Sequence, residues 1–146
     1  MTERQTGRLL ESPIRRILDT VVLVAFVEPK HLLHQVGKKY IEALTTEPDV
    51  FLPSTSLIEL DLVFKSEELN FRQRKEIFGL LSQVIPDQKI LPLTSPVMET
   101  AILLDNQAKW TSHYFDVIIA AYALHYSAKI LTTDKMIPAL GVNVEW

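Results

Sequence analysis

The sequence lacks cysteine altogether and has only four glycines among its 146 residues. Without cysteine there can be no disulfide framework, no thiolate zinc site and no cysteine nucleophile. No apolar run reaches the ~18 residues that a membrane-spanning helix needs, and residues 1–16 lack the apolar stretch of a secretory signal. We therefore expect a cytoplasmic protein that does not enter a membrane.

Several signatures of common enzyme classes are also missing. There is no Gly-x-Gly-x-x-Gly and no Gly-Lys-Ser/Thr string to hold a nucleotide cofactor, and no Gly-x-Ser-x-Gly elbow of a serine hydrolase. The net charge is −3, from 15 Lys and Arg against 18 Asp and Glu. Proteins that hold nucleic acid by overall positive charge are usually more basic, so a nucleic-acid function would have to rest on a local site.

What is present indicates an ordinary globular chain, because 47% of the residues are hydrophobic and 23% are charged. We expect residues 1–13 to be a flexible lead-in and residues 14–146 to form a single domain. Apolar segments predict strands at 14–19, 50–52, 89–91, 129–132 and 142–146, and helices at 21–27, 30–46, 54–65, 70–84, 95–108 and 117–124. Ser54 or Ser56 is expected to cap the third helix. This alternation predicts an α/β fold, with a parallel four- to five-stranded sheet flanked by helices on both faces.

Four acidic residues lie near the carboxyl ends of these strands. Asp19 ends the first strand, Asp134 follows the fourth, Glu59 lies on the helix after the second, and Asp116 opens the buried helix before the fourth. Ligands of such sheets bind beyond the carboxyl ends of the strands, so we expect the four acids to converge. Convergent carboxylates repel one another unless a cation neutralises them. Oxygen ligands favour Mg²⁺ or Mn²⁺, and such metals suit phosphodiester cleavage.

Each acid also has a simpler interpretation. Asp19 could be an ordinary loop acid, and Asp116 could be a helix N-cap, where Asp is favoured. Asp134 could cap a short terminal helix. Glu59 could pair with a Lys or Arg, since an unpaired buried charge is costly, or it could lie at the rim of the fold.

The order of these segments resembles the PIN-domain family of VapC-like metal-dependent ribonucleases. The resemblance rests on residues 17–20 (Ile-Leu-Asp-Thr), 56–59 (Ser-Leu-Ile-Glu), 115–123 (Phe-Asp followed by an alanine-rich apolar stretch) and 131–134 (Leu-Thr-Thr-Asp). It implies a PIN-like α/β/α sandwich that cleaves RNA with Mg²⁺ or Mn²⁺. The implied metal and catalytic residues are Asp19, Glu59, Asp116 and Asp134. Thr132 would support Asp134 or contact the attacking water, and Thr20 would shape the loop after the first strand.

The resemblance also implies partners. It leads us to expect a homodimer that acts as an endoribonuclease, in the role of toxin of a toxin–antitoxin pair, inhibited by an antitoxin protein. His113 and Tyr114, just ahead of Asp116, are candidate RNA contacts, since aromatic rings stack on bases. The family often has Asn where this chain has Val21. The alternative is therefore a catalytically silent PIN-like module that binds RNA or protein.

Overall fold

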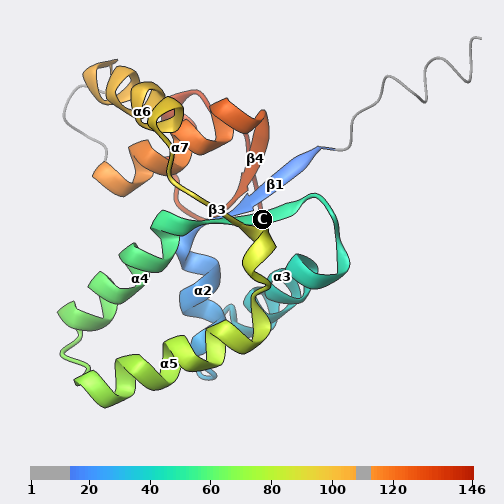
Figure 1. Ribbon diagram of the computed structural model, residues 1–146, viewed down its shortest axis with the longest axis vertical. Helices are drawn as coiled ribbons and strands as arrows, with labels where there is room; N and C mark the ends of the chain where they lie inside the picture. The colour runs from blue at the N-terminus through green and yellow to red at the C-terminus, as the bar shows by residue number, and fades with distance from the viewer. Residues whose placement is uncertain (1–13, 108–112) are drawn as a thin grey trace, which may run out of the picture.

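The computed structural model describes residues 14–107 and 113–146 (Figure 1). Five strands form one parallel sheet in the order β3-β2-β1-β4-β5. The strands are β1 (Arg15–Leu18), β2 (Val50–Pro53), β3 (Ile90–Leu91), β4 (Ala128–Leu131) and β5 (Val144–Glu145). The chain adds β2 and β3 on one side of β1 and then returns to add β4 and β5 on the other. The winding therefore reverses between β1 and β4, where open parallel sheets place their ligands.

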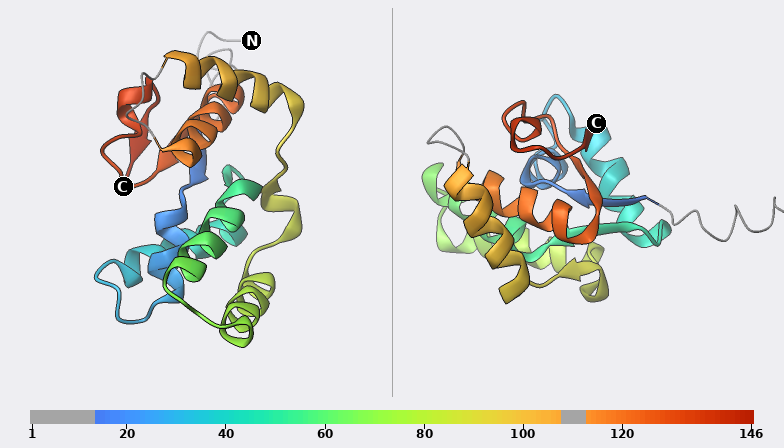
Figure 2. Two further views of the ribbon diagram at one scale, coloured as in Figure 1. Left: turned by 90° about the vertical axis from the view of Figure 1, so that its left-hand side faces the viewer. Right: turned by 90° about the horizontal axis from the view of Figure 1, so that it is seen from above.

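Helices cover both faces of this sheet, as Figure 2 shows. One face is covered by α2 (Thr20–Val27), α3 (His34–Thr46), α4 (Ser54–Ser66) and α5 (Phe71–Val84). The other face is covered by α6 (Ser95–Gln107) and α7 (Tyr114–Tyr126). Two short 3₁₀ helices, η1 (Asp87–Lys89) and η2 (Pro138–Leu140), lie in connections. The predicted α/β/α fold with a parallel sheet is confirmed.

The carboxyl-terminal halves of the central strands β1 and β4 are apolar at consecutive positions because both of their faces are buried there. Ile17 packs with α6 and α7, whereas the next residue, Leu18, packs with the α2 side. In β4, Ile130 likewise packs on the side of α6 and α7, and Leu131 packs on the α2 side. Successive side chains of a strand point to opposite faces, so a sheet covered twice needs apolar residues at consecutive positions.

Some predicted boundaries are wrong. Neither Ser54 nor Ser56 caps α4, because the helix begins at Ser54 itself and its N-cap is Pro53. The helix α7 begins at Tyr114 rather than at residue 117, with His113 as its N-cap. The predicted lead-in, residues 1–13, and the predicted end of α6 at residue 108 lie outside the described residues.

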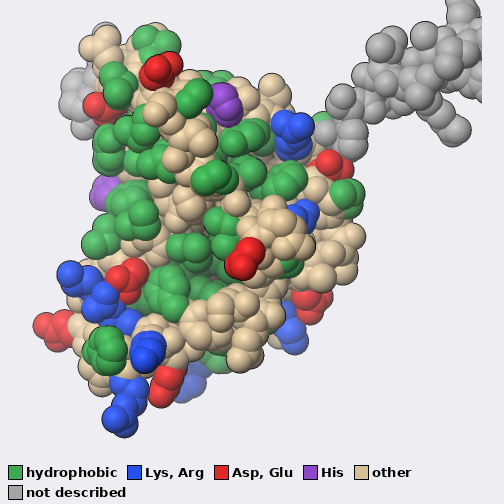
Figure 3. All heavy atoms as spheres, in the orientation of Figure 1, with side chains coloured by type: hydrophobic (Ala, Val, Ile, Leu, Met, Phe, Trp, Pro, Cys, Tyr) green, Lys and Arg blue, Asp and Glu red, His purple; other side chains and the backbone are tan. Residues whose placement is uncertain are grey.

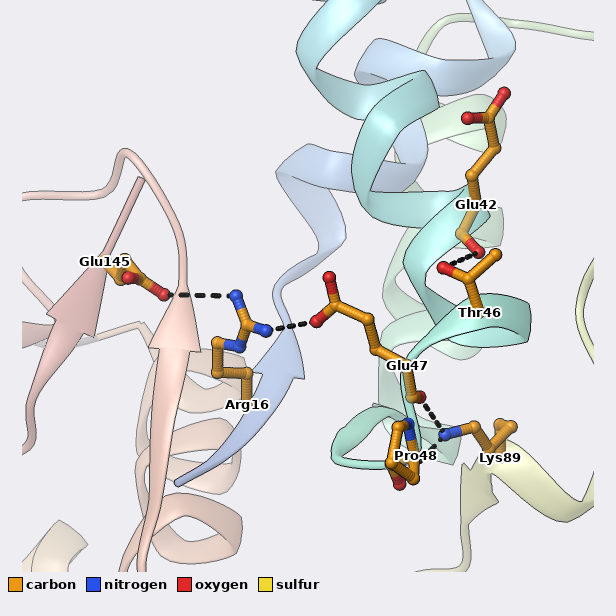
Figure 4. Close-up of polar contacts among 7 residues, drawn as sticks. All are labelled: Arg16, Glu42, Thr46, Glu47, Pro48, Lys89 and Glu145. Atoms are coloured by element: carbon orange, nitrogen blue, oxygen red, sulfur yellow. Dashed lines mark hydrogen bonds and ion pairs between the residues drawn. The ribbon is translucent and has the colours of Figure 1, made fainter. Parts of the chain in front are cut away.

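Polar contacts tie the central strand to its neighbours on the α2 face (Figure 4). The guanidinium of Arg16 pairs with Glu47, which follows α3, and lies 3.8 Å from a carboxylate oxygen of Glu145 in β5. The Lys89 ammonium donates to the carbonyls of Glu47 and Pro48 at 2.8 and 3.1 Å. Arg16 thus lies between two carboxylates, and the Lys89 ammonium is held by two backbone carbonyls.

Within the described ranges, no helix combines the length and the apolar character needed to cross a membrane.

Candidate metal centre

Asp19 is held at the carboxyl end of β1 by its own helix and by the neighbouring strand. The parallel register pairs Leu18 with Leu131, so the residues that follow, Asp19 and Thr132, lie side by side. Asp19 is the N-cap of α2, and its Oδ1 accepts a hydrogen bond from the backbone N–H of Thr20 at 2.8 Å. Its Oδ2 accepts from the hydroxyl of Thr132 at 2.6 Å. The carboxylate is only 7% exposed and has a fixed orientation.

Thr132 joins Asp19 to the segment that carries Asp134. Its hydroxyl oxygen accepts a hydrogen bond from the backbone N–H of Asp134 at 3.0 Å while donating to Asp19. The Asp134 side chain accepts from the backbone N–H of Met136 at 2.8 Å. Asp134 therefore closes a turn, and it does not cap the following 3₁₀ helix, whose N-cap is Ile137.

Glu59 and Asp116 reach the same place from opposite layers of the sandwich. The hydroxyl of Ser56 donates to the carbonyl of Leu18 at 3.4 Å, which holds the first turns of α4 over the end of β1. Asp116 lies in the first turn of α7, and its backbone N–H donates to the carbonyl of His113 at 3.0 Å. Neither carboxylate forms an ion pair with a Lys or Arg of the described residues. Asp116 is not the N-cap of α7, because His113 takes that position. Glu59 has no salt bridge within the described part of the chain, and it is partly exposed, as a rim position would be.

One cavity of about 620 Å³ brings the four acids together. It is lined by Asp19, Thr20, Val21, Val24, Glu59, Val63, His113, Asp116, Thr133, Asp134 and Met136. Tyr114 does not line it, and its side chain is 53% exposed. Our sequence reasoning missed Thr133, Val24, Val63 and Met136. Helical spacing could have identified two of them, because Val63 lies one turn beyond Glu59 and Val24 one turn beyond Thr20.

Burial and the neighbouring acids of the cavity raise the pKa values of Asp19 and Asp116. The pKa of Asp19 is raised to about 6, chiefly by burial and also by the charges of Glu59 and Asp134, against the hydrogen bonds from Thr132 and Thr20. Burial likewise raises the pKa of Asp116 to about 6, assisted by Asp134, Asp19 and Glu59 and opposed by His113. Negative charge is therefore costly here, and a cation would relieve that cost.

The chemistry of these residues fits a hydrated divalent cation. All four ligand candidates offer carboxylate oxygen, which hard cations such as Mg²⁺ and Mn²⁺ prefer. Among the described His, Asp and Glu side chains, no three stand close enough together to enclose one ion. Mg²⁺ usually keeps several waters and takes only one or two carboxylates from the protein. The cavity thus suits a cation that retains part of its hydration shell.

A second hollow lies between α4 and α5, away from the acids. It measures about 470 Å³ and is lined by Leu57, Ile58, Asp61, Leu62, Phe71, Arg74, Lys75 and Phe78. Figure 3 shows hydrophobic side chains gathered over this region, with charged side chains around the far ends of the two helices. Arg74 makes two hydrogen bonds to Asp61, at 2.7 and 2.5 Å. Its charge is therefore engaged within the α4–α5 pair.

Comparisons with known proteins agree with this fold. FitAcB from Neisseria gonorrhoeae is 26% identical over 88% of this chain and 95% of its own, with a TM-score of 0.69. VapBC2 from Rickettsia felis, solved with a DNA fragment from its promoter, is 16% identical over 91% and 99% of the two chains, with a TM-score of 0.71. VapC20 from Mycobacterium tuberculosis, described as a toxin that cleaves the sarcin–ricin loop, is 15% identical over 87% and 95%, with a TM-score of 0.65. The last two likenesses concern the fold alone.

No curated protein sequence matches the chain. The family model described as "PIN domain" matches residues 16–143, which include all four acids and both layers of helices. This protein therefore belongs to the PIN-domain family.

Proposed function

We propose that this protein is an endoribonuclease that hydrolyses RNA phosphodiester bonds with the help of Mg²⁺ or Mn²⁺. The observation that carries the proposal is the convergence of Asp19, Glu59, Asp116 and Asp134 on one cavity at the switch point of the sheet. Two of these carboxyls have a pKa near 6, and none pairs with a Lys or Arg of the described residues. The proposal places the protein in the cytoplasm, where RNA is accessible.

The four carboxylates would hold the cation together with its remaining waters, and Thr20 and Thr132 would hold the carboxylate of Asp19. A bound divalent cation neutralises phosphate charge and makes a coordinated water more acidic. The contacts of Asp19 with Thr20 and Thr132 fix its oxygens before any ligand arrives, which spares reorganisation during the reaction. Of the described residues that line the cavity, His113 is the one that can carry positive charge. We therefore assign it, rather than Tyr114, the contact with the RNA phosphate.

Cleavage of single-stranded RNA in the presence of Mn²⁺ or Mg²⁺ tests this function. Asp116→Asn keeps the shape of the side chain and removes its charge, so cleavage should fall by about 100-fold or more, while the far-ultraviolet circular dichroism stays unchanged. Asp87→Asn, at an exposed position in η1, is the matched control and should cleave like the wild type. Chelator should stop cleavage by the wild type and by Asp87→Asn. Full activity of Asp116→Asn, or activity that survives chelator, would reject the proposal.

A catalytically silent module is the second candidate, and one observation favours it. Val21, at the position where the family often has Asn, lines the cavity beside the acids. A silent module would bind RNA without turnover in saturating Mn²⁺. Clear turnover of any RNA under that condition would eliminate this candidate.

We further propose that the protein is the toxin of a toxin–antitoxin pair and that it forms a homodimer. The solved neighbours include a "toxin-antitoxin complex from Klebsiella pneumoniae", which is 18% identical over 90% of this chain with a TM-score of 0.61. The exposed apolar side chains of the α4–α5 hollow, Ile58, Leu62 and Phe71, are the surface we assign to the antitoxin protein. Ile58→Asp should abolish capture of the protein encoded by the adjacent gene and leave RNA cleavage intact. Capture at wild-type strength would reject this surface.

A further inference from the structure

The acidic cavity also has an apolar side, formed by Val21, Val24, Val63 and Met136. Val21 and Val24 lie nearly one turn apart on α2, the helix that Asp19 caps. Val63 lies one turn beyond Glu59 on α4, and Met136 lies two residues after Asp134. Three of the segments that supply an acid therefore also supply apolar side chains to the same cavity. We call these four residues the apolar wall.

The apolar wall is firmly supported on one side and accessible on the other. Val21 and Val24 pack against the core on the α2 face of the sheet but remain partly exposed. Val63 is also partly exposed, and Met136 is 44% exposed. Because α2 is anchored by the Asp19 cap, its two valines keep a fixed position relative to the acids. The wall can thus contact a ligand without rearrangement of the fold.

We propose that the apolar wall binds the face of a nucleobase next to the phosphodiester held at the acids. This inference rests on the proposed function, because it assumes an RNA phosphate at the carboxylates. A cavity of about 620 Å³ falls within the roughly 300–1,000 Å³ range of pockets that hold small organic ligands. The room therefore suits a nucleoside beside the hydrated cation. The flat face of a base is its least polar surface, and valine and methionine side chains pack well against such surfaces.

The composition of the wall also determines its selectivity. Its four side chains are Val and Met, which offer no strong hydrogen-bond donor or acceptor to the edge of a base. It therefore accepts any base that is free of a helix stack and favours purines, because a purine buries more area. The protein then selects RNA chiefly by the presence of an unstacked base, as is common in RNA recognition, and only weakly by the size of that base.

Short oligoribonucleotides with and without bases test this inference. Oligoadenylate, oligouridylate and an abasic ribose phosphate chain of the same length are compared with the full-length protein in Mn²⁺, by kcat/KM for cleavage and by fluorescence anisotropy for binding. The wild type should prefer both oligoadenylate and oligouridylate to the abasic chain, and should prefer oligoadenylate to it by about tenfold. Equal kcat/KM and equal affinity for oligoadenylate and the abasic chain would overturn the inference.

Two variants locate the contact. Met136→Ala and Val24→Thr should reduce the preference for oligoadenylate over the abasic chain by about threefold or more, and should handle the abasic chain like the wild type. Leu124→Ala on α7, at a similarly exposed position (45%) outside the cavity, is the control and should keep the full preference. Equal losses on oligoadenylate and on the abasic chain would overturn the inference, since the variants would then act through the acids.

The two readouts separate this inference from the proposed function. If the protein binds these RNAs but cleaves none, the proposed activity fails, while a base preference lost in Met136→Ala still supports the wall. If the protein cleaves RNA with no such preference, the activity stands and the wall fails. If Met136→Ala instead loses only its capture of a partner protein, the wall serves that partner and the inference is wrong.

Discussion

Thr132 is the residue that orders the acids before any ligand binds. Its hydroxyl donates to Asp19 and accepts from the backbone N–H of Asp134. The sequence resemblance implied support of Asp134, and the structure shows that the contact is to its backbone and that the side-chain partner is Asp19. The sequence alone could not show that the hydroxyl of Thr132 contacts the side chain of Asp19 and not that of Asp134. The pairing of Leu18 with Leu131 decides which residues become neighbours.

Thr132→Val should therefore weaken the site more than the fold. The variant leaves a carboxylate oxygen of buried Asp19 without its donor, which should lower the free energy of unfolding by about 1–3 kcal/mol. Mn²⁺ affinity should fall by roughly 10–100-fold, as it does when a residue that orients a metal ligand is removed. Thr46→Val, which loses an exposed hydroxyl contact to the Glu42 carbonyl, should change neither by much. Urea unfolding and Mn²⁺ titration of the two variants provide the comparison.

The raised pKa of Asp116 predicts a pH dependence of stability. The folded protein binds this proton more tightly than the unfolded chain does, so the metal-free protein loses stability as pH rises from about 4 to about 6. Asp19 acts in the same direction. Because Asp116 is only partly buried, Asp116→Asn should stabilise the metal-free protein at pH 7.5 by about 1 kcal/mol, less than the full shift implies. Urea unfolding of the wild type and of Asp116→Asn, with chelator present at pH 4 and at pH 7.5, checks this. A gain in stability at pH 4 as large as that at pH 7.5 would contradict it.

At the scale of elements, the packing of α2 against α3 sets the position of the site. Gly37 of α3 lies against α2 so closely that a Cβ there would be 2.8 Å from the Phe26 nitrogen and 2.9 Å from the Ala25 Cβ. The sequence predicts α3 from apolar residues that recur at helical spacing, and we also expected a helix at 21–27, although its continuous β-branched apolar run is locally typical of a strand. The sequence does not predict this close approach, because a lone glycine within a helical pattern has the same local signature wherever it packs.

Two glycine substitutions test the role of this contact. Gly37→Ala should force α2 and α3 apart and lower the free energy of unfolding by about 1–3 kcal/mol. It should also weaken Mn²⁺ binding, because Asp19 is the N-cap of α2. Gly79→Ala on α5, where nothing lies within 4 Å of the added Cβ, should stabilise the protein by roughly 0.5–1 kcal/mol. Thermal and urea unfolding give both values, and equal effects of the two substitutions would contradict the account.

At the scale of the whole molecule, the acids come from both layers of the sandwich. Asp19 and Glu59 belong to elements on the α2 face of the sheet, and Asp116 lies on α7, which covers the other face. The sequence predicted this convergence, because all the strands are parallel and their carboxyl ends share one edge. It could not predict the cavity's apolar wall, since Val63 and Met136 resemble ordinary core residues until the packing of α4 and the last connection is known.

A cation bound between the layers should stabilise the molecule as a whole. Binding to the folded state alone adds about 2.7 kcal/mol when the free ion is at 100 times its dissociation constant. Mn²⁺ should therefore raise the midpoint of thermal unfolding of the wild type and of Asp87→Asn, and should raise that of Asp116→Asn by about half as much or less. An equal rise in all three proteins would mean that the ion binds elsewhere.

Calorimetric titration with Mn²⁺ at neutral pH tests the central claim most directly. The claim is that Asp19, Glu59, Asp116 and Asp134 together bind a divalent cation. The wild type and Asp87→Asn should give saturable binding, and Asp116→Asn and Asp134→Asn should each bind about tenfold more weakly or worse. An unchanged isotherm in both cavity variants, or no binding to the wild type, would contradict the claim.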